Sequence, residues 1–196
     1  MKRFLTILSL CLLFCGIQAC GANPGKKISQ NRISTLVNGL QADAARAGSE
    51  DEDANISLPG LKVTSQGGLN MVTIGNFWIK TGAKFLSFAD DDQDMNEAAR
   101  LMKSLNKLMI VSYDGCEERL RSDFDRKIGK TLDGCDLLME AKDGGESMSF
   151  YGNSSRDGKL LEDIVFYSPE NSTLICFFGT LDTDKFGEFV KKAMND

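Results

Sequence analysis

Cysteine is the residue type with the widest chemistry in this chain, because its 196 residues include no histidine. The lack of an imidazole excludes Ser-His-Asp and Cys-His catalysis, histidine-containing zinc sites and an imidazole pH switch. Cys116 stands between a predicted strand and a predicted helix, and a helix N-terminus can lower the pKa of a thiol. Glu117 and Glu118 follow it and oppose a thiolate, and no cysteine lies two residues away. We therefore favour an inert junction cysteine over an active redox thiol.

The other two cysteines of the C-terminal half also lack a chemical partner in the sequence. A disulfide between Cys116 and Cys135 is disfavoured, because the predicted helix of about 14 residues between them would span roughly 20 Å. Cys176 lies between Ile175 and Phe177 in a strongly apolar stretch. That setting is typical of a core residue.

Two acidic runs have the composition of a calcium site without its pattern. Residues 90–94 (DDDQD) place carboxylates at alternate positions, but Met95 stands where the sharp turn needs glycine and Leu101 where a bidentate glutamate is needed. Residues 50–53 (EDED) are adjacent and do not converge on one ion without a folded loop. We interpret the first run as the start of a helix and the second as a solvated loop. The sequence therefore predicts no metal ligand and no catalytic residue.

Aromatic and glycine patterns add no cofactor site. Phe77 and Trp78, beside Phe85 and Phe88, could line a ligand pocket, but aromatic residues at helical spacing more often belong to a core. The glycine pairs at residues 67–68 and 144–145 fit turns, and neither glycine-rich phosphate-binding motif occurs. We expect no bound cofactor.

The first twenty residues have the pattern of an export signal. Lys2 and Arg3 precede an apolar run at residues 4–13 that is too short to span a bilayer comfortably. Residues 17–20 (IQAC) then resemble the lipobox of bacterial lipoprotein precursors, in which cleavage precedes a cysteine that is acylated. This pattern predicts a signal peptide at residues 1–19, lipidation of Cys20 and a tether at residues 20–27. The alternative is an ordinary signal peptide cleaved near Ala22.

Removal of the signal changes the charge of the chain. The formal net charge goes from −5 to −7 when Lys2 and Arg3 are lost, and 177 residues remain. An acidic chain without a basic stripe is not typical of a nucleic-acid-binding protein. No later segment has 18 uninterrupted apolar residues, so we expect the lipid to be the anchor, with each methylene contributing about 0.8 kcal/mol of membrane affinity.

Residues 28–196 are predicted to form one α+β domain, whose first part, residues 28–106, is mostly helical. Apolar residues recur at helical spacing in residues 28–47, and Gly48 ends that helix. The polar, turn-rich residues 49–68 are interpreted as a loop. Residues 71–88 are ambiguous, with a helix favoured from Asn76 onward. A further helix follows the acidic run and carries an apolar stripe from Ala98 to Leu108.

The second part, residues 107–196, is predicted to form an antiparallel β-meander in the order β-α-β-β-β-β-α. The predicted strands cover residues 108–113, 136–142, 147–151, 160–167 and 172–179, and the helices cover residues 117–130 and a C-terminal segment capped by Asp182 or Thr183. An Asp157-Gly158 pair predicts a type I′ turn between two of these strands. We expect the helices to pack on one face of the sheet.

Four stretches of the chain carry a family resemblance: residues 78–86, 107–113, 136–150 and 174–189, the last with its strand-Gly-turn-Asp-helix step. In these stretches, and in its order of elements, the chain resembles small lipoproteins of Bacteroides-type Gram-negative bacteria, the domain of unknown function 4252 family. The resemblance implies a location and a fold and supplies no catalytic residue.

The function expected from the sequence is that of a non-enzymatic cell-envelope lipoprotein acting as a binding or interaction module. The expected partners are the membrane, through the lipid on Cys20, and an envelope protein or glycan. By resemblance, the location is the outer membrane, facing the periplasm. Two alternatives remain: an envelope enzyme using carboxylates or Cys116, and an envelope-stress or signalling accessory that presents a sheet edge to a partner strand.

Overall fold

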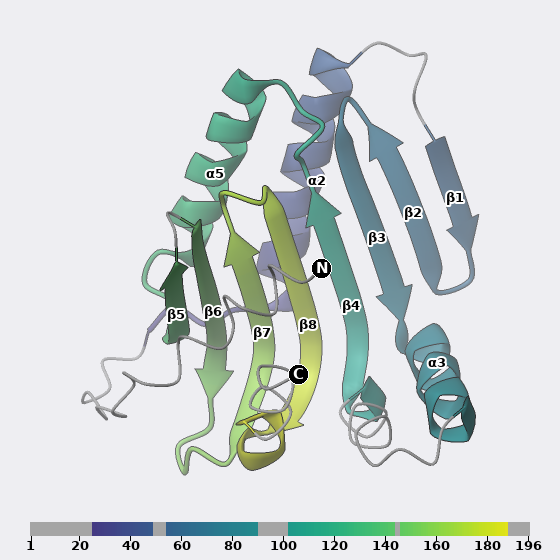
Figure 1. The fold of residues 1–196 in the computed structure, drawn as a ribbon, viewed down its shortest axis with the longest axis vertical. Coiled ribbons are helices and arrows are strands. Elements are labelled where there is room, and N and C mark those ends of the chain that lie inside the picture. Colours follow the sequence, from purple (N-terminus) through teal and green to yellow (C-terminus); the bar gives the residue numbers. More distant parts are fainter. Residues whose placement is uncertain (1–24, 49–53, 90–101, 144–145, 188–196) are drawn as a thin grey trace.

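A computed structural model describes residues 25–48, 54–89, 102–143 and 146–187, with the backbone alone for residues 83–89, 141–143 and 146. The described strands form one antiparallel eight-stranded sheet in the order β1-β2-β3-β4-β8-β7-β6-β5 (Figure 1). Its strands are β1 (Ala54–Leu58), β2 (Leu61–Gln66), β3 (Leu69–Gly75), β4 (Leu105–Ser112), β5 (Leu137–Asp143), β6 (Glu146–Ser154), β7 (Leu160–Ser168) and β8 (Thr173–Asp182). The helices are α2 (Gln30–Ala47), α3 (Asn76–Ala89) and α5 (Glu118–Leu132). The predicted α+β fold class is confirmed.

The C-terminal half follows the predicted order of elements. Strand β8 lies between β4 and β7, so the apolar run around Phe178 forms an internal strand, and Phe178 is 2 % exposed. The Asp182 carboxylate accepts the backbone N–H of Asp184 and Lys185, which caps a helical turn at residues 183–187 as predicted. The type I′ prediction is wrong, because only Gly158 of the Asp157-Gly158 pair has a positive φ.

The N-terminal half contains more strand than predicted. The loop predicted for residues 49–68 is wrong for residues 54–66, which form β1 and β2, so the predicted helical part, residues 28–106, also contains strands. Pro59 and Gly60, with φ +74° at Gly60, make the tight turn between these strands. Residues 69–75 form β3 before the helix from Asn76, which is confirmed. Leu105 and Leu108 lie in β4, so the helix predicted to reach Leu108 ends earlier.

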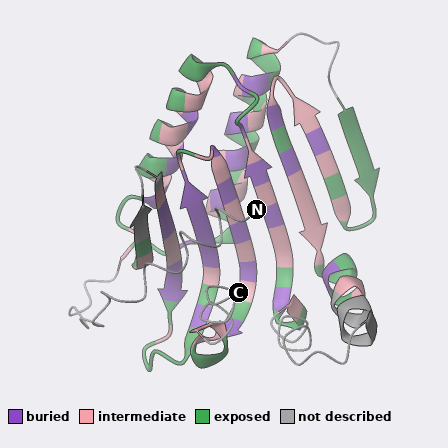
Figure 2. Ribbon diagram, viewed as in Figure 1, coloured by how far each residue is buried: buried purple, intermediate pink, exposed green. Residues whose placement is uncertain are grey.

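Helices lie on both faces of the sheet, with α2 and α5 together on one of them (Figure 1), so the prediction that the helices pack on one face is wrong. We call this the helix-covered face; buried side chains of β3, β4, β7 and β8 pack there against Ile33, Val37 and Phe124 of the two helices. On the opposite face, Ile79 of α3 and Phe186 join a second cluster with Leu105 and Ile164. Burial is concentrated in the central strands, whereas all of β1 is exposed (Figure 2).

Specific polar contacts fix α2 and α5 relative to each other. The Ser29 hydroxyl accepts the backbone N–H of Arg32 and caps α2. The Arg32 guanidinium donates to the carbonyl of Thr131 at the end of α5, and the Lys127 ammonium pairs with Asp43 near the end of α2. These contacts place the N-terminal end of α2 beside the C-terminal end of α5.

A row of β-bulges crosses the sheet from β4 to β5. The regular pairing is interrupted at Asn106 of β4, Asp163 of β7, Gly152 of β6 and Leu138 of β5. These strands lie in this order across the sheet, with β8 between β4 and β7. Asp163 has a φ of +49°, a conformation that non-glycine residues rarely adopt. Bulges bend a strand and increase its twist, so the sheet changes direction along this row.

Candidate functional site

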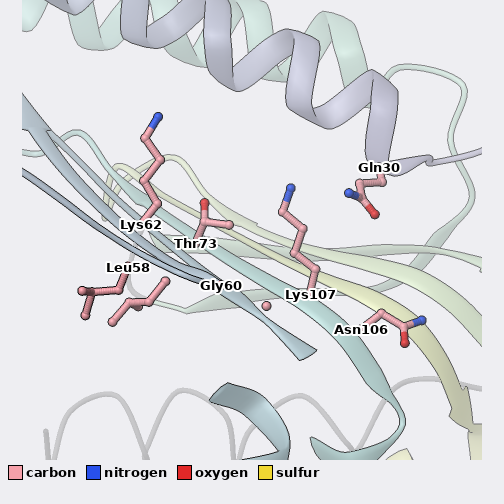
Figure 3. A pocket seen from close by; sticks show the side chains of 9 residues that line it. Gln30, Leu58, Gly60, Lys62, Thr73, Asn106 and Lys107 are labelled. Carbon is pink, nitrogen blue, oxygen red and sulfur yellow. The ribbon is translucent and has the colours of Figure 1, made fainter. Parts of the chain in front are cut away.

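A groove of about 290 Å³ opens on the helix-covered face at the start of α2. We call it the lysine groove; it is lined by Gln30, Leu58, Gly60, Leu61, Lys62, Thr73, Gly75, Asn106 and Lys107. In Figure 3 the side chains of Lys62, Thr73 and Lys107 extend from the sheet toward α2, and Gln30 lies at the end of that helix. Three strands and one helix therefore contribute polar groups to one recess.

Strand register explains why the two lysines share this groove. Lys62 of β2 is paired with Thr73 of β3, and Gly75 of β3 is paired with Lys107 of β4. Paired residues of an antiparallel sheet point to the same face, so all these side chains lie on the helix-covered face. Gly75 has no side chain to fill the space opposite Lys107. The Lys107 ammonium lies 5.8 Å from the centroid of the Phe178 ring, a cation–π contact that orients it.

The groove is cationic within an acidic chain. None of its lining residues is an Asp or Glu, and the ion pairs of the described residues involve neither Lys62 nor Lys107. The N-terminal end of α2 adds the positive end of a helix dipole at Gln30. Two ammonium groups, a hydroxyl and two amides, without a carboxylate among the lining residues, form an arrangement suited to an anion.

The turn between β1 and β2 forms one rim of the groove and is held by α3. The Trp78 indole N–H donates to the carbonyl of Pro59 at 2.7 Å, and the Gly75 N–H donates to the carbonyl of Gly60 at 2.6 Å. Phe77, 69 % exposed, meets Trp78 edge-to-face. The interpretation of these two aromatic residues as core is therefore wrong, since Trp78 is also exposed, at 37 %, and serves to fix the turn.

A second polar group, the tyrosine cluster, lies under α5. The hydroxyls of Tyr113 and Tyr167 both donate to Oδ1 of Asp125, at 2.5 and 2.9 Å. Both tyrosines are buried on the helix-covered face. Burial, together with the neighbouring Asp125 carboxylate, raises the pKa of each tyrosine hydroxyl. The cluster is closed and fully hydrogen-bonded, which indicates a structural role in docking α5.

The cysteines predicted as chemical candidates are dispersed. Cys116 is 5 % exposed and its thiol donates to the carbonyl of Gly67 at 3.4 Å. Burial and the charge of Asp114 raise the pKa of the Cys116 thiol, the opposite of activation. Cys176 is fully buried in β8, and burial raises the pKa of its thiol. Cys116, Cys135 and Cys176 are all free thiols.

Among the described carboxyl groups, Asp163 has its pKa raised by burial. Its side chain accepts the backbone N–H of Gly179 at 3.2 Å, across the bulge between β7 and β8. Gly179 is tightly surrounded, because a Cβ there would lie 2.5 Å from the carbonyl oxygen of Ser104. Asp163 therefore has a local structural task where the sheet bends.

Three sites singled out in the sequence lie outside the described residues: Cys20 and the acidic runs at residues 50–53 and 90–94. Within the described ranges, no group of three or more potential ligands could hold a metal ion. None of the helices in those ranges has the length and hydropathy needed to cross a membrane. The site analysis therefore depends on the lysine groove and the tyrosine cluster.

The lysine groove was not predicted from the sequence. Lys62 falls in the segment interpreted as a loop, and Lys107 directly precedes the predicted strand at residues 108–113, so nothing in their spacing of 45 residues brings them together. For the tyrosine cluster the sequence contains a weak indication. Asp125 directly follows Phe124, which lies on the apolar face of a predicted helix, so its carboxylate is expected near the core.

Comparison with known proteins identifies a family but no function. No curated protein and no solved structure matches the chain significantly. A family of unknown function, DUF4252, matches residues 65–189, more than half of the chain and all of the sheet from β3 to β8. The chain is a member of the DUF4252 family.

Proposed function

We propose that this protein is a lipid-anchored protein of the cell envelope, not an enzyme, that binds a phosphate group in the lysine groove at its anchored end. The observation that carries the proposal is the pair of lysines in a recess without a lining carboxylate, on a chain of net charge −5. The two ammonium groups in the open groove repel each other. An anion bound between them would attract both and offset this repulsion.

The path of the chain before α2 supports the position of the anchor. The Lys26 N–H donates to the carbonyl of Gly134 at 2.6 Å, and Asn153 exchanges two hydrogen bonds with the backbone of Ile28. Residue 25 is therefore held beside the C-terminal end of α5. Cys20 is five residues upstream, so an acyl chain on it would be attached within about 18 Å of that point.

The lysine groove lies at this same end of the domain. Gln30 lines the groove and is the first residue of α2, whose N-terminal end is beside the C-terminal end of α5. A membrane held by Cys20 would then lie near the groove, which favours lipid headgroups as the source of phosphate. The groove is open to solvent, so we expect weak, salt-dependent binding.

Two features support a role without catalysis. The Cys116 thiol is buried, and burial and the charge of Asp114 raise its pKa. The carboxyl group with a raised pKa, Asp163, is engaged by a backbone N–H at a bulge. Neither group lines the lysine groove, whose lining residues include no cysteine, tyrosine or carboxylate.

The anchor is tested by Cys20→Ala in the full chain. Fatty-acid labelling should be lost, and the protein should accumulate as an unprocessed precursor or leave the detergent phase in a phase-separation assay. Cys135→Ser is the matched control and should be labelled like the unmodified chain. An unmodified chain that carries no label and partitions into the aqueous phase would contradict lipidation.

Phosphate binding is tested by titration calorimetry on the detergent-solubilised protein at low salt. The probes are inorganic pyrophosphate and, below its micellar concentration, dihexanoyl phosphatidylglycerol, with dihexanoyl phosphatidylcholine as the zwitterionic control. Tighter binding of the glycerol lipid would identify a headgroup as the source, and tighter binding of pyrophosphate a free phosphate.

The lysines are tested by the double variant Lys62→Ala/Lys107→Ala. We expect it to bind the preferred probe at least tenfold more weakly with little change in thermal unfolding, since among the described residues the ammonium groups lose no ion pair and Lys107 loses a cation–π contact with Phe178. Lys159→Ala, which removes an exposed ammonium group from the loop between β6 and β7, should bind normally. Equal affinity of all three proteins, or no binding of any probe, would refute the groove as the site.

A further inference from the structure

The two edges of the sheet differ in how they are protected. Strand β1 is paired on one side by β2, and all five of its residues are exposed, with Ile56 at 55 % and Leu58 at 49 %. At the other edge, β5 has a bulge and carries Glu140, Lys142 and Asp143. Bulges and charges of this kind discourage pairing with another chain, and β1 has neither.

Hairpin geometry shows which backbone groups β1 leaves open. The turn at Pro59 and Gly60 pairs Leu58 with Leu61, and the register continues through Ile56 with Val63. Residues flanking a two-residue turn form a hydrogen-bonded pair, and such pairs alternate along an antiparallel ladder. The N–H and C=O groups of Leu58 and Ile56 therefore point toward β2, and those of Asn55 and Ser57 point outward.

We propose that β1 pairs with β1 of a second copy of this chain, antiparallel and centred on Ile56. In this register each copy's Asn55 is opposite Ser57 of the other copy, so all four outward-pointing residues form hydrogen-bonded pairs. Ile56 lies on the two-fold axis, opposite itself, in a non-hydrogen-bonded pair. The contact is isologous and closes after two copies.

The side chains of β1 fit this register. Ala54, Ile56 and Leu58 lie on one face of the strand, so Ala54 of one copy is opposite Leu58 of the other, a small residue against a large one. The described strand carries no charge, so no like charges meet across the axis. Pairing would cover Ile56, which is more than half exposed in the single chain.

The dimer would also align the two lysine grooves. The two-fold axis of a continuous antiparallel sheet is perpendicular to it, so the helix-covered faces of both copies lie on the same side. Lys62 is on the strand next to β1 in each copy. A contact of five residues per copy is smaller than a stable interface, so we expect weak association in dilute solution.

Cysteine cross-linking tests the register. Non-hydrogen-bonded partners have Cα atoms about 4.5 Å apart, within disulfide range, so Ile56→Cys should link to itself. The two Leu58 positions are four residues apart along the strands, about 13 Å, so Leu58→Cys should not. Both cysteine variants are made in the full chain together with Cys135→Ser, and the Cys135→Ser protein without an added cysteine is the background control. All three proteins are oxidised in membranes of the expressing cells. We expect at least tenfold more cross-linked dimer from Ile56→Cys.

Equal cross-linking of the two variants, absence of dimer, or a disulfide from Ile56→Cys to a different protein would overturn the proposal. A backbone variant gives an independent test. Ser57→Pro removes an outward N–H without removing a bond to β2, so it should unfold at the normal temperature yet abolish the Ile56→Cys dimer. Asn55→Ala retains its N–H and should leave the dimer intact. A folded Ser57→Pro protein that still cross-links fully would also reject β1 pairing.

Discussion

The helix-covered face holds polar side chains in two regions that differ in surroundings. In the tyrosine cluster, two buried hydroxyls share one carboxylate, and each makes a hydrogen bond. In the lysine groove, two ammonium groups face an open recess, and no ion pair to them is formed within the part of the chain that the structure describes. Buried polar groups must be paired because desolvation is costly, whereas groups in contact with water need no partner. The difference indicates that the cluster stabilises the fold and that the groove is available to a ligand.

The largest expected effect is at Phe178, whose ring lies in the core and also beneath the Lys107 ammonium. Phe178→Ala should lower the free energy of unfolding by about 3–5 kcal/mol, because it removes a fully buried aromatic side chain. Urea unfolding followed by circular dichroism measures this change. Phe77→Ala, at an exposed position, is the control and should change stability by less than about 0.5 kcal/mol. A loss under about 1 kcal/mol at Phe178 would show that this part of the face is not packed as described.

The next effect tests the pairing within the tyrosine cluster. Asp125→Ala should lower the free energy of unfolding by about 1–3 kcal/mol, because two buried hydroxyls lose their acceptor. Asp123→Ala removes an exposed carboxylate from the same helix and should leave the free energy of unfolding nearly unchanged. If the two variants were equally stable, the hydrogen bonds of the tyrosine cluster would not stabilise the fold, and the proposed contrast with the lysine groove would be lost.

These two predictions differ in how far the sequence anticipates them. The apolar run around Phe178 is sufficient to predict an internal strand, because an edge strand could not bury both of its faces. The tyrosine cluster depends on hydrogen bonds between residues 12 and 42 positions apart in the chain, and only the packing of α5 on the sheet brings them together. Local patterns therefore predicted the elements of the C-terminal half, and tertiary packing determined the polar contacts.

The N-terminal half was predicted less well for a physical reason. The exposed strand β1 and its neighbour β2 have few buried side chains, so their sequences lack the apolar runs that mark core strands. The groove lysines fall in this region and at the start of β4, where alternation alone does not say which face is covered by a helix. A short turn at Pro59 and Gly60 was the available signal for a hairpin within residues 54–66.

Alkaline pH should weaken the tyrosine cluster, in addition to its effect on the buried Cys116 and Cys176 thiols, whose pKa is also raised. Burial raises the pKa of Tyr113 and Tyr167 above the value near 10 of an unfolded chain. Above that pH the unfolded state binds fewer protons than the folded state, so stability falls as pH rises. We expect a loss of about 1 kcal/mol per tyrosine between pH 9 and pH 11. Unfolding measured across this range in the unmodified chain and in Tyr167→Phe, which should show a shallower decline, checks the sign and the source.

The smallest expected effect concerns Thr64, an exception on the helix-covered face. Its side chain is 1 % exposed, and among the described residues its hydroxyl oxygen is buried without a hydrogen-bond partner. Thr64→Val keeps the shape and removes the unpaired group, so it should raise the free energy of unfolding by up to about 1 kcal/mol. The matched control is Thr173→Val, whose hydroxyl donates to the carbonyl of Asn171 at 2.8 Å and whose loss should be destabilising. A destabilised Thr64→Val protein would mean that the Thr64 hydroxyl has a hydrogen-bond partner. Thr64 would then be hydrogen-bonded like the buried hydroxyls of the tyrosine cluster.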